Sequence, residues 1–223
     1  MKNNYSSLPD CQLFAGLEET NLDSLLNCLE AVPRKFAKGE VVFTAGGRFD
    51  KVGVVISGNL HIIREDFWGN RTILARIGEG NVFGESFSCA KINRLPVSSI
   101  CAEATEVLLI NYARVITTCS SACAFHAQLI SNMLRILAQK NIALVQKIEH
   151  LTQRTTREKL LSYLSAQALE AGGDIFEIPF NRQELADYLA VERSAMSAEL
   201  SKMRADNILL YHRGRFELLR KDS

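Results

Sequence analysis

The feature that most constrains the fold is an apolar stripe in the second half of the chain. It advances by steps of 4, 3, 4, 3, 4 and 3 through Ile130, Leu134, Leu137, Asn141, Leu144, Ile148 and Leu151. Neither Gly nor Pro interrupts it, so it predicts one long helix with an a/d seam of three heptads. A single heptad would be explained by packing within one chain. Three heptads with an Asn at an a-type position favour a seam between two copies, because a buried Asn there fixes register and strand number.

The region before this helix has a different pattern. Glycines separate short β-branched or aromatic runs within residues 36–112, namely EVVFTA, KVGVVISG, NLHIIRED, RTILARIG, VSSIC and EVLLINY. Short strands at regular spacing, with turns between them, are typical of a β-sandwich or roll. FWGN at 67–70 is predicted to be a hairpin tip, and residues 13–29 to form one or two short helices. The chain is therefore predicted to be α+β.

Two further helical segments follow the long helix. Residues 155–170, TTREKLLSYLSAQALE, are predicted to form a helix that ends at the Ala-Gly-Gly of 171–173. Its inner face holds Leu160, Leu161, Leu164 and Ala168. Asn181 and Glu184 then form a capping-box pattern, NRQE, which predicts the start of a short helix.

The stretch from 182 to 203 has the pattern of a helix-turn-helix. The first helix is predicted to bury Leu185, Ala186 and Leu189, and the second Met196, Leu200 and Met203, with a turn at 190–192. The open face of the second helix then holds Arg193, Ser194, Ser197, Ala198 and Ser201. In a helix-turn-helix such residues reach base edges in the major groove.

The segment after it, NILLYHRGRFELL, predicts a hairpin or wing around a basic tip. Arg213 and Arg215 at this tip, and Arg182 at the start of the first short helix, are predicted phosphate contacts, which position a protein without specifying sequence. Bulk charge does not support DNA binding, since the formal net charge is only +1. Two core helices beside a solvated hairpin remain an alternative at this point.

Together these parts resemble the CRP/FNR family of bacterial transcription regulators over residues 13–220. The sensory domain of that family contains segments similar to FAKGEVVFTAGG, VVISGNLHII and IGEGNVFGES. Its DNA-binding unit contains a segment similar to RQELADYLAVERSAMSAELSKM. The resemblance implies a cyclic-nucleotide-binding-like β-roll (jelly roll) at 1–120, a dimerisation helix at 121–153 and a winged helix-turn-helix at 154–223. It also implies a homodimer on a palindromic DNA site, with RNA polymerase as a partner if the protein is an activator.

The resemblance places an effector pocket at Gly84, Glu85, Ser86, Val97, Ser98 and Asn141. In members that bind cyclic AMP, a Gly-Glu pair binds the ribose and an Arg-Ser pair about ten residues later binds the phosphate. Gly84-Glu85 matches the first pair, but residues 96–98 contain no arginine. A cyclic phosphate needs a charge-assisted donor, so cyclic AMP is not expected and the effector is left unidentified.

The cysteines provide an alternative, a redox- or metal-responsive regulator. Cys119, Cys123 and His126 are spaced i, i+4, i+7 and would need a fourth ligand to hold a metal such as zinc; ordinary packing roles are the simpler explanation. Cys11 and Cys28 do not have the tight spacing of an iron–sulfur cluster, and the isolated His61 does not indicate haem.

Neither enzymatic activity nor export from the cell is expected from the sequence. Among the four histidines only His61 lies in the β region, so no metal-dependent enzyme is expected. The six cysteines include no CxxC pair and are interpreted as reduced thiols. No apolar run is long enough to span a membrane, and the first residues contain no signal-peptide core, so a cytoplasmic protein is expected.

Overall fold

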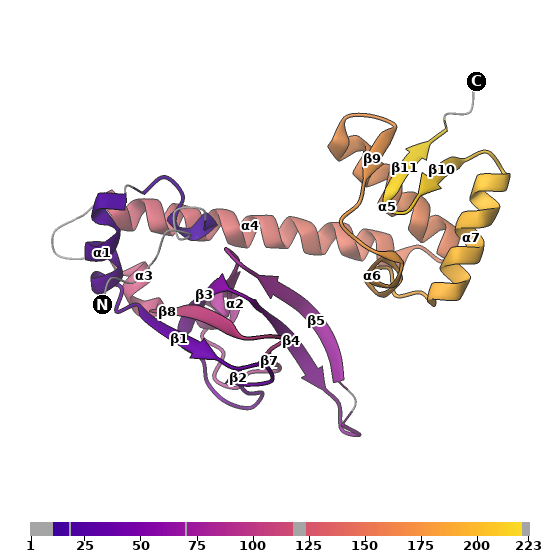
Figure 1. Ribbon diagram of the computed structural model, residues 1–223. Coiled ribbons are helices and arrows are strands. Elements are labelled where there is room, and N and C mark those ends of the chain that lie inside the picture. The colour runs from indigo at the N-terminus through magenta and orange to yellow at the C-terminus, as the bar shows by residue number, and fades with distance from the viewer. Residues whose placement is uncertain (1–10, 18, 70, 118–123, 220–223) are drawn as a thin grey trace. The chain divides into compact units, whose positions relative to one another are not determined.

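The computed structural model describes residues 11–17, 19–69, 71–117 and 124–219 (Figure 1). The chain divides into two compact units, 1–138 and 139–223, and the boundary falls within the long helix α4 (Ala124–Thr152). No helix in the described ranges is long and apolar enough to cross a membrane. The predicted boundaries at 120/121 and 153/154 separate a sensory domain, a dimerisation helix and a DNA-binding domain, and they stay a prediction.

Unit 1 is built from two four-stranded antiparallel sheets. Their orders are β1-β8-β3-β6 and β2-β7-β4-β5. The strands are β1 (Val32–Phe36), β2 (Val41–Phe43), β3 (Lys51–Ser57), β4 (Asn59–Glu65), β5 (Arg71–Gly78), β6 (Val82–Phe83), β7 (Ser98–Cys101) and β8 (Thr105–Asn111). All six strands predicted within 36–112 are confirmed, and β4 and β5 form the predicted hairpin. Asn70 of its predicted tip lies outside the described residues. Strands β1 and β6 were not predicted.

The longest apolar runs lie where the sheets are covered on both sides. Val55 and Val107 face a core shared by the two sheets, together with Leu60 of β4. Val54 and Leu108, from the same two strands, face a second core formed with the helices. A strand buried on both faces has a nearly continuous apolar sequence, which explains KVGVVIS and EVLLIN.

Helices close the second core. The predicted short helices are η1 (Gln12–Phe14) and α1 (Glu19–Cys28); α2 (Glu85–Cys89) and α3 (Tyr112–Ile116) were not predicted. The first part of α4 buries Leu129, Met133 and Ile136 in this core. Asn132 is also buried there, and its amide donates to the carbonyl oxygens of Leu13 and Ala15 at 3.0 and 2.9 Å. These bonds tie the N-terminal segment to α4.

The predicted seam lies outside this buried face of α4. Leu134, Leu144 and Ile148 are 63%, 62% and 59% exposed, and Asn141 between them is also exposed. Leu137 is partly buried against the unit 1 core, and Ile130 and Leu151 are half-buried. Within the described ranges, Leu134, Leu144 and Ile148 therefore lack apolar cover over more than half of their surface.

Unit 2 combines three helices with a three-stranded sheet of order β10-β11-β9. Its elements after α4 are α5 (Thr156–Ala171), β9 (Ile175–Glu177), α6 (Arg182–Tyr188), α7 (Arg193–Ala205), β10 (Leu209–His212) and β11 (Arg215–Leu218). The predicted helices and hairpin are confirmed, whereas β9 was not predicted. One core joins α5, α6, α7 and the sheet through Leu164, Leu185, Leu200 and Phe216.

His150, near the end of α4, is buried in unit 2. Its Nδ1 lies 2.7 Å from Ser162 Oγ, and its ring meets the Tyr163 ring edge-on with centroids 5.7 Å apart. Burial lowers the pKa of His150, and the smaller opposing influence of Glu149 does not cancel this. The imidazole is therefore held in its neutral form.

This burial makes the stability of unit 2 depend on pH. The unfolded chain binds the His150 proton at about pH 6.5, and the folded chain binds it only at lower pH. The free energy of unfolding should therefore decrease as pH falls below about 6.5, until the folded pKa is passed. His150→Gln, which keeps a hydrogen-bonding group but does not titrate in this range, should show a shallower decrease between pH 7.5 and 5.5 in thermal melts. Equal slopes would contradict this assignment.

Candidate DNA-binding site

The turn between α6 and α7 fixes the geometry of the site. Asn181 caps α6 and forms the predicted capping box with Glu184, at 3.0 and 2.9 Å. Ala190 in the turn has φ +49°, a left-handed conformation that is uncommon outside glycine and disfavoured for bulky residues. Glu192 then caps α7, a role that the sequence analysis did not assign to it.

The open face of α7 is the predicted one. Arg193, Ser194, Ser197, Ala198 and Ser201 are all exposed, whereas Met196, Leu200 and Met203 are buried. The Ser201 hydroxyl donates to the Ser197 carbonyl at 3.0 Å, and it lies 3.4 Å from the Tyr211 hydroxyl of the wing. The first two turns of α7 thus present one guanidinium and small polar groups.

Arg157 braces this helix from α5. Its guanidinium bonds Glu199 at 3.3 Å and Asp206 at 2.5 Å. Lys159, also on α5, donates to the Leu189 carbonyl at 3.2 Å, next to the turn. Glu199 is acidic and close to the predicted reading face, but its carboxylate is largely buried and held by Arg157. This role of Arg157 was not predicted, because nothing local to residue 157 signals a partner 42 positions away.

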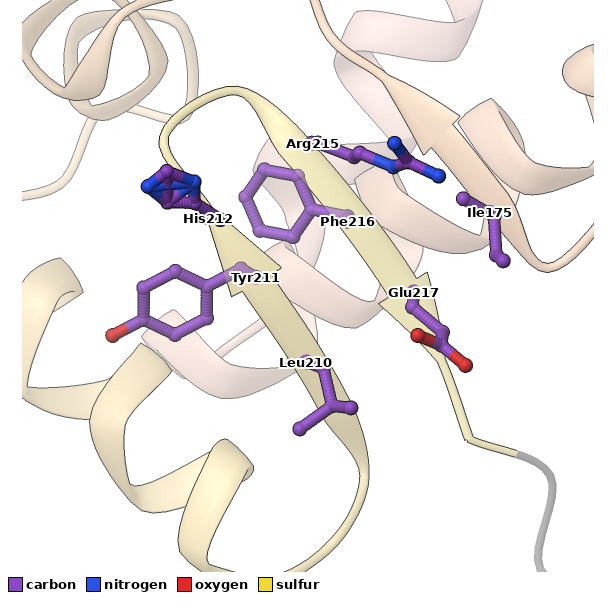
Figure 2. A pocket seen from close by; sticks show the side chains of 7 residues that line it. All are labelled: Ile175, Leu210, Tyr211, His212, Arg215, Phe216 and Glu217. Atoms are coloured by element: carbon purple, nitrogen blue, oxygen red, sulfur yellow. The ribbon is translucent and has the colours of Figure 1, made fainter.

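The hairpin β10–β11 forms the wing, with Arg213 and Gly214 as its two-residue loop. Arg213 is exposed and left-handed, with φ +54°. Arg215 is exposed as well, but it pairs in register with Glu177 of β9, and Figure 2 shows its side chain extending toward Ile175. Arg213 therefore lies at the tip of the wing, whereas Arg215 lies on β11 opposite β9.

Arg182 is held against the wing. Its guanidinium carbon lies 4.7 Å from the centroid of Tyr211 and 5.2 Å from that of Phe216, and burial lowers its pKa from the usual value. Such cation–π contacts contribute about 0.5–2 kcal/mol. Arg204 of α7 lies near the same tyrosine ring, 5.3 Å from the Tyr211 centroid. Tyr211 is thus a junction of wing and helices that sequence reasoning did not identify.

The residues predicted for the effector pocket have mixed environments. Gly84 is left-handed, with φ +77°, and a Cβ there would lie 2.4 Å from the Phe49 ring, so the position needs glycine. Glu85 is buried at the start of α2 and accepts a hydrogen bond from Ser86 Oγ at 3.1 Å. Gly84, Glu85 and Ser86 are consecutive residues and form the start of α2.

The other predicted pocket residues differ from this group. Val97 is buried in the core between the sheets. Ser98 lies on β7 and accepts a hydrogen bond from the Ala45 backbone amide at 2.8 Å. Asn141 is an exposed residue of α4 and belongs to unit 2. The pocket as a whole stays a prediction.

Of the three proposed metal ligands, His126 lies within the described residues. Cys119 and Cys123 lie outside the described residues. His126 is buried in unit 1, with its Nε2 3.9 Å from Cys28 Sγ. Within the described ranges, His, Cys, Asp and Glu side chains form no group of three that could hold a metal ion.

Two family models match the chain, one in each part. Residues 33–121 match the cyclic nucleotide-binding domain, and residues 158–223 match the Crp-like helix-turn-helix domain. A human voltage-gated delayed rectifier potassium channel is 26% identical over 148 residues, 60% of this chain. The chain spans only 14% of the length of that channel.

Solved structures share the fold over most of the chain. CprK complexed with OCPA is 13% identical with a TM-score of 0.66, and the match covers 91% of this chain and 92% of that one. The c-di-GMP-responsive global regulator CLP of Xanthomonas campestris is 19% identical with a TM-score of 0.60, covering 92% and 100%. FixK2 of Bradyrhizobium japonicum is 19% identical with a TM-score of 0.52, covering 86% and 93%.

Proposed function

The chain belongs to the CRP/FNR family of transcription regulators, and we propose that it binds a palindromic DNA site as a homodimer under the control of a small effector. The observation that carries this proposal is the second helix of the helix-turn-helix. Its apolar face is buried, and its N-terminal turns expose Arg193 and three serines. Side chains at these positions of a recognition helix contact base edges.

The exposed stripe on α4 supports the homodimer. Leu134, Leu144 and Ile148 expose more than half of their surface on one long helix. Large apolar residues gathered in this way mark interaction sites. A second copy of α4 offers the matching stripe, so pairing in a two-stranded seam would cover both. The two recognition helices would then need to lie one DNA turn apart, about 34–36 Å.

The effector differs from cyclic AMP in this proposal, because residues 96–98 offer no arginine for a cyclic phosphate. CprK and CLP, which share the fold, are described with OCPA and c-di-GMP respectively. Proteins that share this fold are thus described with chemically different small molecules. Gly84, Glu85 and Ser86 are the part of the pocket that we assign to effector binding.

Selection of duplexes from a random pool, read by sequencing, tests the proposal. The purified protein should enrich a palindrome whose half-sites are centred 10–10.5 base pairs apart, or a multiple of that spacing. The selection is run with and without added cell metabolites, so that a missing effector is supplied in one arm. Failure to enrich any motif in both arms would refute the proposed function.

A further inference from the structure

The recognition helix begins with an unusual cap. Serine, threonine, asparagine and aspartate are the preferred N-cap residues, but α7 is capped by Glu192. Its Oε2 accepts hydrogen bonds from the Ala195 backbone amide at 3.3 Å and from the Ser194 hydroxyl. The carboxylate is therefore fixed at the end of α7 that carries the predicted base-reading residues.

Glu192 is exposed and ionised at neutral pH. The hydrogen bond from Ser194, followed by that from the Ala195 amide, lowers the pKa of this carboxyl. The Ser194 backbone amide contributes a further contact. A carboxylate offers about four lone-pair sites on its two oxygens, so Glu192 keeps capacity to accept from a molecule outside the chain. An ionised carboxylate accepts hydrogen bonds and cannot donate them.

This chemistry discriminates among the bases. In the major groove guanine presents two acceptors and thymine one, whereas adenine presents a donor beside an acceptor. Cytosine presents the N4 amino group, a donor without an acceptor beside it. The same carboxylate occupies the helix N-terminus, where free backbone amides would otherwise attract a phosphate.

From these contacts we infer that Glu192 is a specificity-determining residue, whose carboxylate accepts a hydrogen bond from the N4 amino group of a cytosine in each half-site. This inference rests on the proposed function, since it concerns the same recognition helix. Arg193, the next residue, is suited to guanine, so the two side chains would read neighbouring positions with opposite hydrogen-bonding requirements.

The test compares the wild-type protein with Glu192→Ser in the duplex selection described above. Serine keeps a side-chain oxygen for the cap, so α7 should keep its start, which circular dichroism and thermal melting check. The wild-type motif should contain a cytosine in each half-site that the variant no longer selects. In anisotropy titrations, replacing that cytosine should weaken wild-type binding about 5–150-fold per half-site and the variant less than about 2-fold.

Glu158→Gln is the matched control. Glu158 also accepts from a backbone amide at a helix start, that of Thr155 at 3.0 Å, but it lies on α5. This variant should select the wild-type motif. Two outcomes would overturn the role of Glu192 and leave the proposed function standing. In one, Glu192→Ser selects the same palindrome as the wild-type protein; in the other, it loses a preference for a base other than cytosine. The absence of any wild-type motif overturns both.

Discussion

Arg193→Ala should weaken binding to the selected site by about 1–3 kcal/mol in each half-site and should remove the preference for one guanine. Arg193 is exposed at the first position of α7, and a guanidinium can bond the O6 and N7 atoms of guanine together. Alanine keeps the helix and removes only this group. Anisotropy titrations against the selected duplex, and against duplexes with each base replaced in turn, measure both effects.

Arg213→Ala is the control for this variant. Arg213 lies in the two-residue loop of the wing, where we expect it to contact a phosphate. Its removal should weaken binding to all DNA sequences alike. It should also reduce the magnitude of the slope of log affinity against log salt concentration by about 1 for each subunit. If the two variants showed the same loss and the same sequence profile, the division between base reading and phosphate binding would be wrong.

The double variant Leu144→Glu, Ile148→Glu should convert the dimer into monomers. These side chains are 62% and 59% exposed on α4, so a seam would bury somewhat more than half of each. Burial of that extent contributes about 1 kcal/mol or more per side chain. The four lost side chains of a dimer then raise its dissociation constant by roughly 1000-fold. Sedimentation equilibrium measures this constant directly.

Leu169→Glu provides the comparison for the seam. Leu169 is 83% exposed on α5 and lies outside the apolar stripe of α4. The Leu169→Glu variant should remain a dimer and should bind the palindrome as the wild-type protein does. A double variant that sediments like the wild-type protein would show that the stripe on α4 is not the contact between copies.

Sequence patterns predicted the elements whose signals are local. The capping box at Asn181, the end of α5 at the glycines of 172–173, and the buried spacing of α7 are all fixed by residues within a few positions of one another. Strands β3 and β8 were predictable for a related reason. Their apolar runs are long because both faces of the sheet are covered.

The elements that were missed depend on distant partners. β1 reads VPRKF, with a proline and two cations, and becomes a strand because β8 pairs with it. β9 is only three residues long and is defined by β11. Asn132 is buried because two carbonyl groups more than a hundred positions earlier accept its hydrogen bonds. None of these partners can be found from the sequence around the residue.

The site was predicted in the same uneven way. Helical spacing was enough to predict which face of α7 is exposed. The cap at Glu192 was missed because glutamate is an uncommon N-cap, and the position of Arg182 depends on two aromatic rings of the wing. The effector pocket was assigned by resemblance, and its residues have no shared local pattern.

The pairing of β1 with β8 also sets an order of events during synthesis. Val32 pairs with Leu109 and Phe36 with Thr105, so the partner of β1 is made roughly seventy to eighty residues later. At translation rates of about 5–20 residues per second, β1 waits on the order of 4–15 s for this partner. During that time Arg34 and Lys35 keep the strand charged, which discourages pairing with a wrong edge. The wait is shorter in unit 2, where β9 pairs with β11 only about forty residues later.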